Sequence, residues 1–265
     1  MKDKTNKCII DLGPGDGRKT AIPVEYAINS GRYGTVTVGL VDCSEDMLKT
    51  SGDYLEAFIR DKLKKEPHIA RIHERFENLK ESEEYRNFVS KHEKDEREFL
   101  FYGSTAGNFD PPIILGILYD SMLPKDHAQV GLHLYTEGHD DDILKKYQGS
   151  DARDVSFVGL KELGFTEKDK GAMEYYAEIT KREYEEFKEF DLGPLTAVKT
   201  FFRAKEPMER GLITLKGGDS LQAVLSIKYR EDQARRVFEY GGKFNILEIY
   251  KDGDIAIIWM RKTGA

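Results

Sequence analysis

Apolar runs and amphipathic segments alternate along the first half of the chain. Five apolar or β-rich runs predict strands at about 7–12, 35–41, 69–72, 98–102 and 128–135. The amphipathic segments between them predict helices at about 18–31, 45–64, 78–93 and 111–122. Because strands that alternate with helices usually form a parallel sheet, this half of the chain is predicted to be of the α/β class.

A different pattern follows residue 136. Helical periodicity covers 140–170, and strand-like runs then follow at about 174–180, 195–203, 211–216 and 221–229, which favours an antiparallel sheet. The chain closes with a helix at about 230–240 and a hairpin of 243–250 and 254–261. A sheet that begins with parallel strands and closes with a hairpin resembles the seven-stranded methyltransferase architecture, which implies that residues 1–136 and 230–265 form one domain, with 137–229 inserted into it as an α+β lobe.

Composition and charge limit the classes of function. The chain has 265 residues, 39% of them hydrophobic and 34% charged, with a formal net charge of -7. Because nucleic-acid binding relies on clustered Lys and Arg, this acidic balance disfavours nucleic acid as a partner. Cys8 and Cys43 are the only cysteines and are expected to be reduced thiols, and no Cys or His cluster predicts a metal.

Targeting signals are not visible in the sequence. Residues 1–7 contain no apolar stretch, and no segment approaches the roughly 18 apolar residues of a membrane span. The expectation is a cytoplasmic protein with no membrane partner.

The stretch from Cys8 to Gly17 joins the first predicted strand to a glycine-rich turn. Gly13, Gly15 and Gly17 are spaced two apart after Asp11, and no Gly-Lys-Ser/Thr sequence follows to make a phosphate-binding loop. Such glycines suit an ordinary strand-to-helix turn or a backbone that lies close to a ligand. The sequence Asp-Leu-Gly-x-Gly-x-Gly resembles the first motif of class I S-adenosylmethionine (AdoMet) methyltransferases, which bind a cationic ligand beside carboxylates.

Asp42 ends the second predicted strand, 25 positions after Gly17. Ligands of open α/β sheets bind beyond the carboxyl ends of the strands, and a carboxylate there can accept both hydroxyls of a ribose. A capping or turn role also fits Asp42. The pattern predicts a ligand that contains adenosine. NAD is the alternative, although dinucleotide sites read Gly-x-Gly-x-x-Gly.

Gly103-Ser-Thr-Ala-Gly-Asn-Phe109, after the fourth strand, has a close parallel in a known family. It resembles the histidine-specific methyltransferases of ergothioneine biosynthesis, which trimethylate the α-amino nitrogen of histidine. The resemblance extends to Gly17-x-Lys-Thr20, Val41-Asp-x-Ser44, Glu74-Arg-Phe76 and Ser226-Ile-Lys-Tyr229. It implies a seven-stranded, Rossmann-like class I methyltransferase fold with an inserted α+β substrate lobe, a monomer, and AdoMet as cofactor with S-adenosylhomocysteine as product.

The resemblance also implies roles for individual residues. Asn108 would bind the amino and carboxylate end of an amino-acid substrate, and Ser226 and Val224 would line its side-chain pocket. Plain core packing also fits Phe76, and the exposed face of a strand also fits Ser226. The residues implied for the cofactor are Asp11, Gly13, Gly15, Gly17, Lys19, Asp42, Ser44, Phe76, Gly103 and Ser104.

Several positions depart from the family. Val224 replaces the glutamate that grips the imidazole, and Arg75 replaces an aspartate expected before Phe76. The sequence also starts close to strand one, so we expect an acceptor site without the family's N-terminal tyrosines. These differences weaken histidine as the substrate more than they weaken AdoMet. They favour an acceptor side chain that is more apolar or differently shaped.

Methyl transfer needs little catalysis from side chains, because positioning an unprotonated amine in line with an activated methyl group supplies most of the acceleration. Tyr135 and His139 follow strand five and are candidates for a proton acceptor, although His139 also fits an exposed loop. Asp140–Asp142 are better explained by a helix N-terminus than by a metal.

The sequence thus predicts an AdoMet-dependent N-methyltransferase of a small amine or amino-acid-like acceptor, and histidine is not the expected acceptor. A methyltransferase of protein or RNA is one alternative. A non-catalytic protein that binds AdoMet or a nucleotide and regulates or scaffolds a partner is another.

Overall fold

The computed structural model describes residues 4–103 and 105–264. The chain divides into two compact units. Unit 1 comprises Met1–Ala106, Pro111–Leu132 and Val237–Ala265, and unit 2 comprises Gly107–Asp110 and His133–Arg236. None of the helices within the described ranges is long and apolar enough to cross a membrane.

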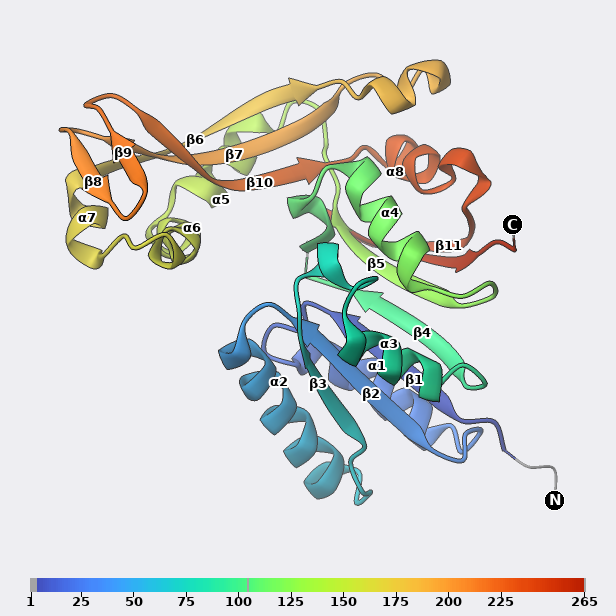
Figure 1. Ribbon diagram of the computed structural model, residues 1–265. Helices are drawn as coiled ribbons and strands as arrows, with labels where there is room; N and C mark the ends of the chain where they lie inside the picture. Colours follow the sequence, from blue (N-terminus) through green and yellow to red (C-terminus); the bar gives the residue numbers. More distant parts are fainter. Residues whose placement is uncertain (1–3, 104, 265) are drawn as a thin grey trace. The chain divides into compact units, whose positions relative to one another are not determined.

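Unit 1 contains a seven-stranded sheet with the order β11-β12-β5-β4-β1-β2-β3 (Figure 1). Neighbouring strands from β1 to β5 pair in parallel, whereas β11 and β12 are antiparallel. The amide of Lys125 donates to the carbonyl of Lys262, and the amide of Lys262 donates to Asp126, so β12 also runs opposite to β5. The strands are β1 (Lys7–Leu12), β2 (Val36–Asp42), β3 (Ile69–His73), β4 (Glu96–Phe101), β5 (His127–His133), β11 (Phe244–Asp252) and β12 (Ile255–Lys262).

This strand order and orientation define the Rossmann-like fold of class I methyltransferases, and the predicted α/β class and seven-stranded sheet are confirmed. The central strands are mostly buried, because helices cover both faces of the sheet, and their charged residues lie at or near the strand ends. Such burial leaves the carboxyl ends of β1, β2 and β4 as the place where polar residues can meet a ligand.

Helices pack on both faces of the sheet in unit 1. α1 (Arg18–Asn29) and α2 (Glu45–Ala57) bury Val24 and Leu48 in one cluster with Leu40 of β2. Gly39 points to the other face, where a Cβ would lie 2.6 Å from the ring of Phe88 on α3 (Glu83–Lys91). α4 (Pro111–Ser121) joins α3 through the hydroxyl of Tyr85, which donates to the carbonyl of Ser121 at 3.0 Å.

The helix predicted at 78–93 is shorter than expected. A single 3-10 turn covers Phe76–Asn78, and α3 begins only after Ser82, whose hydroxyl accepts from the amide of Tyr85. Ser82 therefore acts as an N-cap, and two glutamates in the first turn add favourable charge there.

Unit 2 contains a three-stranded antiparallel sheet with the order β10-β7-β6. Its core is formed by Phe157 and Leu160 of α6 packed on Phe202 of β7, with Met173 of β6 beside them. Strands β8 and β9 pair separately as a small hairpin, where the sequence predicted one strand at 211–216. The elements are α5 (Asp140–Gln148), α6 (Ser150–Glu162), α7 (Glu167–Ala172), β6 (Met173–Arg182), β7 (Leu195–Ala204), β8 (Met208–Arg210), β9 (Ile213–Leu215) and β10 (Ser220–Lys228).

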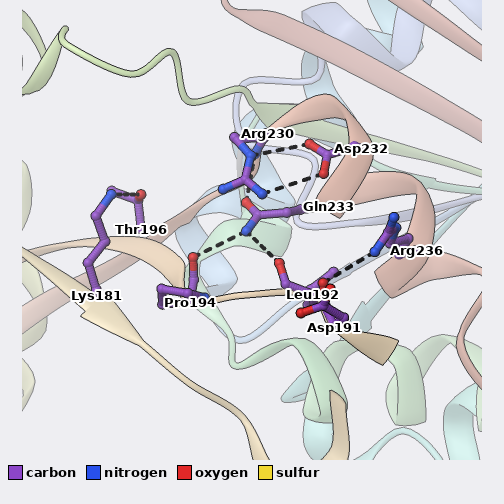
Figure 2. Close-up of polar contacts among 9 residues, drawn as sticks. All are labelled: Lys181, Asp191, Leu192, Pro194, Thr196, Arg230, Asp232, Gln233 and Arg236. Atoms are coloured by element: carbon purple, nitrogen blue, oxygen red, sulfur yellow. Dashed lines mark hydrogen bonds and ion pairs between the residues drawn. The ribbon is translucent and has the colours of Figure 1, made fainter. Parts of the chain in front are cut away.

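Helix α8 (Glu231–Phe238) is tied to the loop that precedes β7 (Figure 2). The buried amide of Gln233 donates to the carbonyls of Leu192 and Pro194, at 3.0 and 3.1 Å. Arg236 donates to the carbonyl of Asp191 at 3.2 Å. These bonds satisfy the carbonyls of Asp191, Leu192 and Pro194, which lie outside the sheet. They hold the loop in place where it leads into β7.

Candidate functional site

The glycine-rich turn between β1 and α1 is held by backbone hydrogen bonds. The amide of Gly13 donates to the carbonyl of Val41 on β2 at 2.9 Å, and the amide of Gly17 donates to Pro14 at 3.0 Å. Gly17 has φ +79° and a Cβ there would lie 2.9 Å from the carbonyl oxygen of Ser51, so a side chain is excluded. A Cβ at Gly15 would meet no atom within 4 Å, so this loop borders open space there.

Asp11 is buried at the carboxyl end of β1, beneath this turn. Its Oδ2 accepts from the hydroxyl of Thr20 on α1 at 2.5 Å, whereas Oδ1 is buried without a hydrogen-bond partner among the described residues. Burial raises the pKa of Asp11 to about 7, and nearby Asp42 adds to the increase, whereas Thr20 and Lys19 oppose it. An unpaired, buried carboxylate oxygen is costly and is best explained by a donor or cation that a ligand brings.

Asp42 lies at the carboxyl end of β2, next to β1 in the sheet. Its Oδ1 accepts from the amide of Ser44 at 2.9 Å, and the carboxylate is half-buried. Burial raises the pKa of Asp42 above its ordinary value. Ser44 is the N-cap of α2, where its hydroxyl accepts from the amide of Met47 at 3.3 Å. The hydroxyl of Ser44 is thus engaged in capping α2.

The other cofactor candidates lie around strand β4. Gly103 follows β4 with φ +74°, and a Cβ there would lie 3.2 Å from Nζ of Lys19. Phe76 packs edge-on against Phe101 with ring centroids 5.4 Å apart and stays partly exposed, so it combines core packing with an accessible edge. Ser104 lies outside the described residues.

The acceptor candidates belong to unit 2. Asn108 is exposed and ends a 3-10 turn at Thr105–Asn108. This turn lies against β10, because a Cβ at Gly107 would be 3.0 Å from the carbonyl oxygen of Ile227 and 3.8 Å from Oγ of Ser226. Asn108 and Ser226, 118 positions apart in the sequence, are therefore brought close together.

Asp110 fixes the chain just after Asn108, a role that the sequence did not predict. Its carboxylate accepts from the guanidinium of Arg182, at 2.6 and 3.3 Å. The hydroxyl of Tyr184 also donates to it, at 2.8 Å. A bidentate pair with arginine gives a well-defined geometry, so these contacts limit how far the turn with Asn108 can move.

Ser226 belongs to a polar group of four side chains, Ser226, Lys228, Tyr147 and His133, which we name the Lys228 cluster. Nζ of Lys228 donates to Oγ of Ser226 at 3.1 Å, to the hydroxyl of Tyr147 at 2.8 Å and to Nδ1 of His133 at 3.1 Å. Tyr147 donates to Ser226 at 3.0 Å. Ser226 is only 2% exposed, so its alternative placement on an exposed strand face is wrong.

Val224 lies on the same face of β10 as Ser226 and Lys228, because side chains two positions apart point to the same side of a strand. It pairs with Thr200 of β7, which in turn pairs with Ala177 of β6. Neither neighbour carries a charge. An imidazole N–H beside Val224 would therefore have no carboxylate from these strands to accept it.

Tyr135 and His139 lie in different environments. Tyr135 is buried, its hydroxyl donates to Asp140 at 2.9 Å, and Nζ of Lys181 lies 4.2 Å from its ring centroid. His139 is an exposed residue at the start of α5, and its Nδ1 lies 3.9 Å from a carboxylate oxygen of Asp142. Exposure of the imidazole favours the loop interpretation of His139 over a role in proton transfer. Among the described residues, no group of three or more His, Cys, Asp or Glu side chains could hold a metal ion.

Comparison with known families gives the class of protein that this fold and site define. Residues 1–148 match the profile described as "Histidine-specific methyltransferase, SAM-dependent". This chain therefore belongs to the family of histidine-specific, AdoMet-dependent methyltransferases. The match includes the glycine-rich turn, Asp42 and Asn108, and it stops before β10 with Val224 and Ser226.

Solved methyltransferases resemble the chain at low sequence identity. A methyltransferase from Methanosarcina mazei is 12% identical, with TM-score 0.46, and the match covers 100% of this chain and 95% of that one. The 1,6-didemethyltoxoflavin-N1-methyltransferase of Burkholderia thailandensis, solved with S-adenosylhomocysteine, is 10% identical, with TM-score 0.45 and coverage of 99% and 72%. The glycopeptide N-methyltransferase MtfA is 9% identical, with TM-score 0.43 and coverage of 96% and 88%. No curated protein matches the sequence significantly.

The residues at the carboxyl ends of β1, β2 and β4 fit AdoMet chemically. The buried Oδ1 of Asp11, which has no hydrogen-bond partner in the part of the chain that the structure describes, suits a cation or an N–H donor, and the half-buried carboxylate of Asp42 suits hydroxyl donors. The open space beside Gly15 leaves room for a ligand to lie against the backbone.

Proposed function

We propose that this methyltransferase transfers the methyl group of AdoMet to an amino nitrogen of a small, amino-acid-like acceptor other than histidine. The observation that carries the proposal is Val224. It lies on the face of β10 that carries Ser226, where the family resemblance implies a glutamate for the imidazole, and its neighbours on β7 and β6 are Thr200 and Ala177.

In this proposal the cofactor is held by residues of unit 1. AdoMet, when bound, supplies a methyl group on a cationic sulfur that is already activated for displacement. Asp42 accepts the ribose hydroxyls, Asp11 provides negative charge for the cationic end, and Gly13–Gly17 let the backbone approach. Phe76 offers its exposed edge to the adenine, and Gly103 keeps the end of β4 free of a side chain beside Lys19.

The acceptor is held by residues of unit 2. The amide of Asn108 offers both a donor and an acceptor, which suits the amino and carboxylate groups of an amino acid. Ser226 and Val224 line the position of its side chain. The amine must lose a proton before it attacks, because only a free electron pair can form the new carbon–nitrogen bond. Tyr135 is better placed than His139 to influence this proton, since it is buried and its hydroxyl is oriented by Asp140.

The test is a direct survey of acceptors. The purified chain is incubated with AdoMet and each proteinogenic amino acid, and S-adenosylhomocysteine and the methylated product are measured by mass spectrometry. We expect N-methylation of at least one amino acid, with histidine at least about tenfold slower, because an unpaired imidazole N–H costs about 1–3 kcal/mol. Histidine as the preferred acceptor would contradict the proposal, and so would the absence of transfer to any amino acid.

A further inference from the structure

The Lys228 cluster contains a buried cation surrounded by neutral groups. Lys228 is 2% exposed, and its Nζ donates to the hydroxyls of Ser226 and Tyr147 and to the ring of His133. A lysine ammonium can only donate, so Nδ1 of His133 accepts and this ring is neutral. Within residues 4–103 and 105–264, no carboxylate forms an ion pair with Lys228. A buried charge without a counter-charge is unusual in a folded protein.

The hydrogen atoms of the cluster leave one hydroxyl donor unused. Apart from the Nε2–H of the neutral His133 ring, which makes none of the hydrogen bonds within the cluster, there are five donors: Lys228 brings three N–H donors, and Tyr147 and Ser226 bring one O–H donor each. The four hydrogen bonds among the cluster residues use four of these five donors. Tyr147 donates to Ser226, so both lone pairs of the Ser226 hydroxyl are taken, by Tyr147 and Lys228. The remaining donor is the hydroxyl proton of Ser226, and no described residue accepts it.

This unused donor is polarised by positive charge. Lys228 donates to Ser226 directly and also through Tyr147, so both paths draw electron density from the Ser226 oxygen. A second lysine lies on the same face, because Thr196 of β7 pairs with Lys228 on one side and with Lys181 on the other. Nζ of Lys181 donates to the hydroxyl of Thr196 at 2.8 Å (Figure 2), and no described carboxylate forms an ion pair with it.

We infer that Ser226 and the Lys228 cluster bind the side-chain carboxylate of the acceptor, so the substrate is an acidic amino acid. A carboxylate accepts the free Ser226 proton and supplies the counter-charge that Lys228 lacks among the described residues. A neutral amide accepts the proton but leaves the charge uncompensated, and an imidazolium or ammonium would add a like charge. The inference rests on the proposed function, in which Asn108 takes the amino end of the same molecule.

Binding of defined amino acids separates this inference from the proposed function. Aspartate, glutamate, asparagine and glutamine are titrated by calorimetry into the whole chain saturated with S-adenosylhomocysteine. We expect aspartate or glutamate to bind at least tenfold more tightly than its own amide. Isoglutamine, which keeps the side-chain carboxylate of glutamate and neutralises the α-carboxylate, tests the source of the charge. If glutamate is the ligand, isoglutamine should bind more tightly than glutamine.

Substitutions in the Lys228 cluster test whether the cluster causes the preference for the acidic ligand over its amide. Ser226→Ala removes the free donor and leaves Lys228 bonded to Tyr147 and His133, so the chain should stay folded, as circular dichroism can check. Both Ser226→Ala and Lys228→Met should weaken binding of the acidic ligand at least tenfold and change binding of its amide less than threefold. Lys188→Met is the control, because it removes the same charge from an exposed position of unit 2. It should change neither the binding of the acidic ligand nor the binding of its amide.

Two results would overturn the inference. One is equal or tighter binding of the amide by the unmodified chain, and the other is unchanged binding of the acidic ligand by Ser226→Ala. The proposed function survives either result if methyl transfer to some amino acid is observed. If neither acid nor amide binds to the chain saturated with S-adenosylhomocysteine, the inference is wrong. The proposed function also fails if no amino acid accepts a methyl group.

Discussion

Asp11 should make the folded chain less stable at neutral pH than its asparagine variant. The carboxylate is 1% exposed, one of its oxygens has no hydrogen-bond partner among the described residues, and its pKa is raised to about 7. Asp11→Asn keeps the size of the side chain and an oxygen that can accept from Thr20, but it can never carry the charge. The variant therefore isolates the free energy of burying that charge.

The magnitude follows from the pKa. The ordinary value for Asp11 is 3.8, and one pKa unit corresponds to about 1.4 kcal/mol, so ionising the buried group costs about 4 kcal/mol. A raised carboxyl pKa means that the folded state holds the proton more strongly than the unfolded state. The contribution of Asp11 to stability therefore falls as pH rises from about 4 to about 7 and stays low above that. Residual hydration reduces the figure, so we expect Asp11→Asn to gain about 2–4 kcal/mol at pH 8 and almost nothing at pH 4.

Urea unfolding measured between pH 4 and pH 8 checks this expectation. The difference in unfolding free energy between Asp11→Asn and the unmodified chain cancels titrating groups that do not interact with Asp11, whereas the interaction of Asp11 with Asp42 and Lys19 remains part of the difference. Asp16→Asn is the matched control, because Asp16 lies in the same turn with an exposed side chain and should change stability by less than about 0.5 kcal/mol. If the difference for Asp11→Asn does not vary with pH, Asp11 ionises normally and our account of its unpaired oxygen is wrong.

Three further predictions concern the cofactor and the acceptor. Asp42→Ala should weaken AdoMet binding by about 1.5–3 kcal/mol in calorimetry, as expected when a charged hydrogen-bond partner is lost, and an unchanged affinity would remove Asp42 from the cofactor site. Gly17→Ala should lower the unfolding free energy by more than Gly15→Ala in urea titrations, because both positions have positive φ but only Gly17 also meets the Ser51 carbonyl at 2.9 Å; equal losses would show that the contact relaxes. Val224→Glu should raise kcat/KM for histidine about tenfold or more, since it supplies a carboxylate for the imidazole N–H, and no gain in acceptor assays would mean that Val224 does not control substrate choice.

The sheet of unit 1 could be predicted from sequence because its signals are local. Each strand is a short apolar run between turn or cap residues, and alternation with helices fixes the parallel arrangement. The same local reasoning missed the break before α3, although Ser82 followed by Glu83 and Glu84 repeats the pattern of Ser44 at the start of α2. The pattern of charged residues across 78–93 fits a helix throughout, so it predicts a helix that starts before the N-cap at Ser82.

The cofactor candidates were also accessible to sequence reasoning, because they follow strand ends within a short distance of one another. The Lys228 cluster was not. Tyr147 and Lys228 are 81 positions apart, and only the fold of unit 2 brings them within hydrogen-bond distance. Lys228 was overlooked because a lysine in a strand is usually solvated. Its place two residues after Ser226, on the same face of β10, was the one available hint.

The chain passes between unit 1 and unit 2 four times, which limits how it can be divided into fragments. Gly107–Asp110 belongs to unit 2 but is separated in sequence from His133–Arg236 by a segment of unit 1. Asp110 pairs with Arg182 and Tyr184, which follow it by 72 and 74 positions. During synthesis, the turn that carries Asn108 emerges long before the residues that fix it. A fragment limited to 133–236 would lack both Asn108 and the carboxylate that anchors its turn. Under the proposed function, acceptor recognition therefore needs the uninterrupted polypeptide and cannot be transplanted with residues 133–236 alone.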